Sequence, residues 1–153
     1  MSSAFLARER KGDIKKVEAC ACLVAVADPF YRKALRGILH NMQFKIIETC
    51  RDGGQAIFLI QQMNFIDLII LQEDLPIHCC AEIVQLVRNS KNWAPSDLPI
   101  ISVGWKWTRE KIELARQAWV TDVVVFPTSQ HALQRRILSA LYSERPLKGE
   151  RAE

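Results

Sequence analysis

The sequence lacks the features that assign a protein to a membrane or secretory class. No apolar run approaches the roughly 20 residues that a membrane-spanning helix needs. The basic N-terminus is followed by no long apolar segment, so no signal-peptide pattern is present. No internal repeat or low-complexity segment is visible. We therefore expect a cytoplasmic protein that makes no contact with a membrane.

A strong charge of one sign is also missing. The net charge is +4 over 153 residues, a mild basic excess that is well short of the basic surface of a nucleic-acid-binding domain. The basic residues near the N-terminus alternate with Glu9, Asp13 and Glu18, which is typical of a solvated tail. We expect no nucleic-acid partner.

The cysteines and histidines do not follow the pattern of a metal or catalytic site. The cysteine count is odd and no secretory signal is present, so a disulfide framework is not expected. The three histidines, His40, His78 and His131, lie on different predicted elements. We predict free thiols, no metal, no cofactor and no enzymatic activity. The five cysteines are Cys20, Cys22, Cys50, Cys79 and Cys80.

What the sequence does contain is a regular alternation of strand-like and helical segments. Apolar runs rich in β-branched residues alternate five times with segments that have apolar residues at helical spacing. The predicted strands are 23–26, 44–49, 68–71, 99–103 and 122–126. The predicted helices are 29–42, 55–62, 80–88, 108–118 and 129–142, and a polar loop at 89–98 contains Trp93 and Pro95.

This alternation predicts an α/β fold with a parallel sheet and helices on both faces. Five strand–helix units at this length match the flavodoxin-like strand order 2-1-3-4-5. The functional crevice of such a fold lies at the carboxyl ends of the first and third strands. We expect one domain over residues 21–142, a charged N-terminal extension at 1–20 and a flexible charged tail at 143–153.

The third predicted strand and its loop have a distinctive sequence, Asp67-Leu-Ile-Ile-Leu-Gln-Glu-Asp-Leu-Pro76. It closely resembles the third strand of the receiver domains of response regulators, the CheY-like family. The turn at 52–56, the fourth strand that begins at Leu98-Pro99, and Pro127 also match that family in order and spacing. The resemblance extends over about residues 23–141 and implies the CheY-like version of the predicted fold.

The residues that perform phosphoryl transfer in receivers are missing from the corresponding places. The resemblance puts Gln72 where receivers have the phosphoryl-accepting aspartate, and a neutral amide is too poor a nucleophile to form an acyl phosphate. Of the acidic pair that holds Mg²⁺, Asp28 alone remains. Gly104 replaces the hydroxyl residue, Phe126 the lysine, and Val123 the aromatic switch residue. We therefore predict a degenerate phosphorylation pocket without a metal.

Two acids next to Gln72 offer an alternative. Glu73 and Asp74 follow the acceptor position directly. Because successive residues of an extended chain point to opposite sides, we expect Glu73 to face away from the pocket. Asp74 reaches back only if the loop is remodelled. In this alternative, Asp28 and a displaced Asp74 bind Mg²⁺ and the domain is phosphorylated.

The leading hypothesis is a pseudo-receiver, meaning a receiver-like domain that works by binding proteins in a two-component or phosphorelay pathway. The resemblance implies a histidine kinase, a phosphotransfer protein or another regulator as partner. It also implies docking or homodimerisation through the face from the fourth to the fifth helix. Trp105, Trp107 and Trp119 lie in or beside the loops of that face and are candidate contacts, although each is also a candidate for the core.

A third hypothesis belongs to another class, a flavodoxin-like domain that binds a small ligand or uses Cys79 and Cys80 in thiol redox chemistry. The sequence offers no phosphate-cradling glycine loop for this function, because Gly53 and Gly54 follow the second strand instead of the first.

Overall fold

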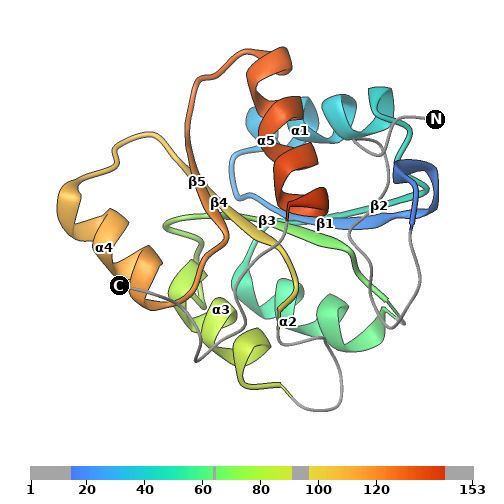
Figure 1. Ribbon diagram of the computed structural model, residues 1–153. Helices are drawn as coiled ribbons and strands as arrows, with labels where there is room; N and C mark the ends of the chain where they lie inside the picture. Colours follow the sequence, from blue (N-terminus) through green and yellow to red (C-terminus); the bar gives the residue numbers. More distant parts are fainter. Residues whose placement is uncertain (1–14, 64, 91–96, 144–153) are drawn as a thin grey trace.

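The computed structural model describes residues 15–63, 65–90 and 97–143. After a short 3-10 helix, Val17–Ala19, strands and helices alternate along the chain (Figure 1). The strands are β1 Ala21–Ala25, β2 Ile46–Cys50, β3 Leu68–Gln72, β4 Ile100–Gly104 and β5 Asp122–Val125. The helices are α1 Pro29–Asn41, α2 Gly53–Gln62, α3 Cys80–Arg88, α4 Arg109–Gln117 and α5 Gln130–Tyr142.

The five strands form one parallel sheet in the order β2-β1-β3-β4-β5. Helices α1 and α5 cover one face, and α2, α3 and α4 lie on the other (Figure 1). Along β1, Cys22 and Val24 pack toward α1 and α5, while Leu23 and Ala25 pack toward the opposite helices, as the two-residue period of a strand requires. The predicted flavodoxin-like fold, in its CheY-like version, is confirmed.

The limits of the elements differ from the predicted ones by one or two residues. Helix α3 has the predicted bounds. Strand β1 begins at Ala21, two residues early, because the Ala21 N–H donates to the carboxylate of Asp67 at 2.8 Å. Strand β2 begins two residues late, because Gln43 has a φ of 71° and the Phe44 N–H still bonds to the end of α1.

Some predictions concern residues that the structure does not describe. Trp93 and Pro95 of the polar loop lie outside the described residues, as do residues 1–14 and 144–153 of the two charged ends. Within the described part, no helix is long and apolar enough to cross a membrane.

Residues 15–20, which the sequence analysis assigned to the N-terminal extension, pack against the domain. Lys15 Nζ lies 3.1 Å from the carboxylate of Asp67, whose side chain is 3% exposed. Val17 and Cys20 are buried in the core between the sheet and helices α1 and α5. A buried acid is tolerated when it is paired and hydrogen-bonded, and Asp67 has both kinds of partner, so it fixes the start of β1.

Substitution by alanine is expected to have opposite effects on stability at two helical glycines, Gly37 and Gly53. A Cβ at Gly37, in the middle of α1, would meet nothing within 4 Å. We expect Gly37→Ala to raise the free energy of unfolding by about 0.5–1 kcal/mol, because alanine loses less conformational entropy in a helix. A Cβ at Gly53 would collide with the backbone and Cβ of His78, so Gly53→Ala should lower the free energy of unfolding by about 1–3 kcal/mol.

Urea denaturation of the two variants measures this difference, provided the slope of the transition is unchanged. Destabilisation by Gly37→Ala, or no effect of Gly53→Ala, would contradict the described packing of these two helices.

Candidate functional site

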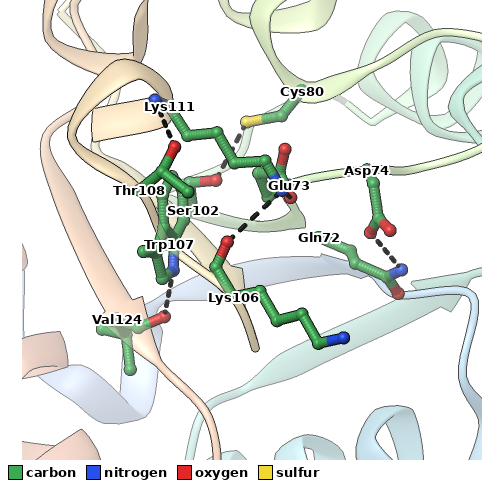
Figure 2. Close-up of polar contacts among 10 residues, drawn as sticks. All are labelled: Gln72, Glu73, Asp74, Cys80, Ser102, Lys106, Trp107, Thr108, Lys111 and Val124. Atoms are coloured by element: carbon green, nitrogen blue, oxygen red, sulfur yellow. Dashed lines mark hydrogen bonds and ion pairs between the residues drawn. The ribbon is translucent and has the colours of Figure 1, made fainter. Parts of the chain in front are cut away.

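The candidate site lies at the carboxyl edge of the sheet, where β3 ends in a buried amide. Gln72 is 7% exposed. Its Oε1 accepts a hydrogen bond of 2.7 Å from the Ala27 N–H, and its Nε2 donates one of 2.7 Å to Asp74 Oδ1 (Figure 2). One neutral side chain therefore joins the β1–α1 loop to the β3–α3 loop.

The acid that remains after β1 caps a helix. Asp28 is the N-cap of α1, and its carboxylate accepts two backbone hydrogen bonds from the first helical turn at 2.8 and 3.2 Å. Within the same turn, Arg32 Nη1 donates to the carbonyls of Val26 and Ala27 at 2.8 and 3.1 Å. A guanidinium thus already binds the loop carbonyls. The sequence analysis missed Arg32, because an arginine one turn into an amphipathic helix has no distinguishing pattern.

The two displaced acids point in different directions. Glu73 lies beside β4 and α4, where its Oε1 is 3.4 Å from Lys111 Nζ. Asp74 is exposed and turns back so that its carboxylate reaches the amide of Gln72 (Figure 2). Among the residues that the structure describes, no three His, Cys, Asp or Glu side chains group as a metal site would require.

The place of the missing hydroxyl is covered by an indole. A Cβ at Gly104 would lie 3.1 and 3.2 Å from two atoms of the Trp107 ring and 3.3 Å from the Cβ of Glu73. Trp107 Nε1 donates to the Val124 carbonyl at 3.1 Å (Figure 2). Ser102, two residues earlier on β4, is 1% exposed and accepts a hydrogen bond from the Cys80 thiol at 3.3 Å.

Phe126 is the buried member of a cluster of three aromatic rings. Its ring stacks on Tyr31 of α1 at 5.2 Å and 18°, and Trp105 meets both rings edge-on, at 5.9 Å from Phe126 and 5.0 Å from Tyr31. Phe126 is 5% exposed. Offset and edge-on rings at these separations stabilise one another beyond the apolar area they bury. The cluster therefore makes this part of the site apolar.

The three candidate interface tryptophans are all half-buried. Trp105 packs on the face that α1 and α5 cover, and Trp107 on the opposite face. Trp119 follows α4 with a φ of 72°, a left-handed conformation that glycine adopts more readily than other residues. Its carbonyl accepts a hydrogen bond of 2.9 Å from Arg88 Nε. Trp105 and Trp107 thus pack within the domain, and all three tryptophans keep a solvent-exposed part.

The adjacent cysteines differ in their environment. Cys79 is exposed at the start of α3, whereas Cys80 is buried. Burial raises the pKa of the Cys80 thiol to about 12, and burial likewise raises the pKa of the Cys50 thiol to about 11. A thiol with such a pKa is protonated near neutral pH and a weak nucleophile.

Comparison with known proteins finds the same fold in receiver domains, while no family model matches the sequence. The Vibrio cholerae chemotaxis protein CheY4 superposes with a TM-score of 0.73 and 21% identity over 80% of this chain and 99% of that chain. The receiver domain of a Pseudomonas aeruginosa sensor histidine kinase, crystallised with magnesium in its active-site cleft, has a TM-score of 0.70 and 21% identity over 80% of this chain and 97% of that chain.

A curated relative gives the sequence match. The transcriptional regulatory protein CitT of Halalkalibacterium halodurans is 28% identical over 111 residues, which make up 72% of this chain and 46% of that protein. The chain thus spans about half the length of this relative. A putative response regulator from Chloroflexus aurantiacus has a TM-score of 0.73 at 18% identity over 80% of this chain and 97% of that chain. The structural neighbours are CheY-like receiver domains, and the chain has their fold.

Restoring a hydroxyl at Gly104 tests the packing of Trp107. We expect Gly104→Thr to lower the free energy of unfolding by about 1–3 kcal/mol, because a side chain at this point overpacks the site against the indole. Urea denaturation measures the loss. In a Trp107→Ala background the same substitution should cost clearly less, because the two sites are in contact. Equal costs in both backgrounds would show that Trp107 does not cover this position.

Thiol titration tests the environments of the cysteines. At about pH 8, where a thiol must ionise to react with a disulfide reagent, we expect Cys79 to react quickly in the native protein. The four buried cysteines should react after unfolding, since burial keeps the Cys50 and Cys80 thiols protonated. A Cys79→Ser variant should lose the fast phase. Rapid native reaction of two thiols would favour the redox hypothesis.

Proposed function

We propose that this domain acts in two-component or phosphorelay signalling by binding other proteins and does not accept a phosphoryl group. The observation that supports this most is Gln72. Its buried amide stands where the resemblance places the acceptor carboxylate, and both ends of the amide are hydrogen-bonded within the protein. An amide provides no carboxylate nucleophile for an acyl phosphate, so we assign the domain no enzymatic role.

The electrostatics of the pocket support the same proposal. Phosphoryl transfer depends on metal and cationic groups that stabilise the developing charge, and Mg²⁺ prefers hard, anionic oxygen ligands. Here the Asp28 carboxylate caps α1, and Phe126 lies in an aromatic cluster where receivers have a lysine. An unpaired buried charge would cost several kcal/mol, and replacing the acids and the lysine together avoids leaving one.

The loop between β4 and α4 is held from both faces of the sheet. Trp105 packs edge-on against the stacked rings of Tyr31 and Phe126 on one side, and Trp107 covers Gly104 and donates a hydrogen bond to the Val124 carbonyl of β5 on the other. Moving this loop would expose both rings. We therefore propose that its conformation is set by packing within the domain or by a partner, independently of phosphate.

We place the docking surface on α4, β5 and α5. Large apolar side chains are exposed there: Ile112 is 46% exposed, Leu114 60% and Val125 54%. Because Trp105 and Trp107 are committed to internal packing, these aliphatic residues are the better anchors. The proposed partner is a histidine kinase, a phosphotransfer protein, another regulator or a second copy of the chain.

One observation favours the phosphorylatable alternative. The carboxylate of Asp74 turns toward the pocket and lies 2.7 Å from Gln72 Nε2. Together with Asp28, it would supply two of the oxygens that a magnesium ion needs. An experiment on the pocket must therefore distinguish Asp74 from Glu73.

Tryptophan fluorescence during the addition of Mg²⁺ and then beryllofluoride, a phosphoryl mimic, tests the proposal. Trp105 and Trp107 adjoin the site and should report its occupation. We expect no saturable change at millimolar Mg²⁺, because the pocket offers one neutral amide and a capped acid in place of three carboxylates. A saturable change that needs both additions and disappears in Asp74→Ala, but persists in Glu73→Ala, would replace the adaptor function with phosphorylation.

A further inference from the structure

Helix α1 presents an unusual outer surface. Phe30, in its first turn, is 71% exposed although it is a large apolar residue. Residues three, four and seven positions later lie on the same side of a helix. The exposed residues of α1 that continue this surface are Lys33, Ala34, Arg36, Gly37, His40 and Asn41; with Phe30 they are here called the α1 surface.

The two charged residues of the α1 surface, Lys33 and Arg36, are both basic. Helices α1 and α5, which lie side by side on one face of the sheet (Figure 1), contain no aspartate or glutamate. Within the described part of the chain, Lys33 and Arg36 take part in no ion pair. By contrast, Lys111 and Arg116 of α4 are paired with acids, and α2 has no charged residue. Lys33 and Arg36 therefore place positive charge, unpaired among the described residues, on the α1 surface itself.

Gly37 has no role within the domain that its conformation or packing explains. Its φ is not in the left-handed region, and a Cβ there would meet nothing. Glycine is nonetheless among the least favourable residues in the middle of a helix. A partner that approaches the backbone of α1 closely at this point would account for it, because only glycine leaves the backbone fully accessible.

A hollow continues the α1 surface at the carboxyl end of the helix. It measures about 510 Å³ and lies between Asn41 and Met42 of α1 and Gln134 and Leu138 of α5, with residues 16–18 at its border. Its lining mixes apolar and polar side chains, and Lys16 and Glu18 contribute one charge of each sign. It is large enough to receive a side chain of a bound segment.

The charge of the two ends of this chain argues against either end as the segment that binds the α1 surface. Residues 1–14 contain three basic and two acidic residues, and residues 144–153 contain three of each. Neither end is acidic. A second copy that docked through the same surface would bring the positive charges of Lys33 and Arg36 together. Like charges placed opposite each other across an interface disfavour association.

We infer that the α1 surface binds an acidic amphipathic segment of a partner protein. The apolar side of that segment contacts Phe30 and lies close to the backbone at Gly37, and its carboxylates pair with Lys33 and Arg36. The exposed aromatic anchor and the close approach favour a protein over a nucleic acid, which would need a denser basic surface. This inference does not depend on the proposed role of α4, β5 and α5.

The test uses the full chain and a synthetic helical peptide, about three turns long, with glutamates on one side and leucines on the other. We expect backbone amide shifts of the ¹⁵N-labelled protein to change in α1 and the adjoining part of α5. Lys33→Glu combined with Arg36→Glu should weaken binding about tenfold or more, because complementary charges become repulsive. A peptide with glutamine in place of glutamate should bind much more weakly.

A matched control variant has the same change in net charge at a different site on the surface. Lys45→Glu combined with Arg51→Glu alters two exposed basic residues next to β2 by the same net charge, and it should leave the affinity nearly unchanged. Equal weakening by both double variants would show that binding follows net charge, and the inference would be withdrawn. The inference would also be withdrawn if the amide shifts changed mainly outside α1 and α5. The same holds if duplex DNA bound the α1 surface as tightly as the acidic peptide does.

Gly37→Leu tests the close approach separately. The side chain would point into open solvent, so the variant should fold normally, which circular dichroism checks. We expect it to weaken peptide binding several-fold by holding the segment away from the backbone, whereas Gly37→Ala should weaken it less. Unchanged binding by Gly37→Leu would overturn the proposed contact.

Discussion

One buried amide organises the carboxyl edge of the sheet. Gln72 has a donor and an acceptor on the same side chain, so it satisfies the Ala27 N–H and the Asp74 carboxylate at once. An aspartate at this position would accept hydrogen bonds and repel Asp74, and it would need a cation nearby. The neutral side chain removes that need. It joins the two loops through its own hydrogen bonds, while an aromatic cluster occupies the neighbouring place where receivers have a lysine.

The aromatic residues near the site are compatible with a neutral side chain at position 72. An aromatic ring such as Phe126, in the place where receivers have a lysine, is compatible with an uncharged residue at the acceptor position, whereas burial near a carboxylate would raise the energy of the charged group. With Tyr31 and Trp105 it forms a cluster that ties α1 to the loops after β4 and β5. On the opposite face, Trp107 covers Gly104. The aromatic cluster and Trp107 thus hold the β4–α4 loop from both faces of the sheet, which supports the proposal that its conformation does not depend on phosphate.

The sequence predicted the fold well because its signals are periodic and local. The strand order and the bounds of α3 follow from apolar spacing. Apolar spacing does not predict contacts between residues that are far apart in the chain, such as the stacking of Tyr31 on Phe126. The turn of Asp74 toward Gln72 was also hidden, because strand alternation applies only while the backbone stays extended, and β3 ends at Gln72.

The distribution of charge separates two kinds of surface on this domain. Acids and bases are mixed on α4, where Glu73 and Glu113 neutralise two basic residues, and the exposed side chains there that could bind a partner are aliphatic. On α1 and α5 the helices have basic residues and no acid. Apolar contacts depend little on salt, whereas exposed charge pairs are screened over about 10 Å at 0.1 M ionic strength. Partners of the two surfaces would therefore respond differently to ionic strength, and a domain whose pocket is internally closed would still be able to join two proteins.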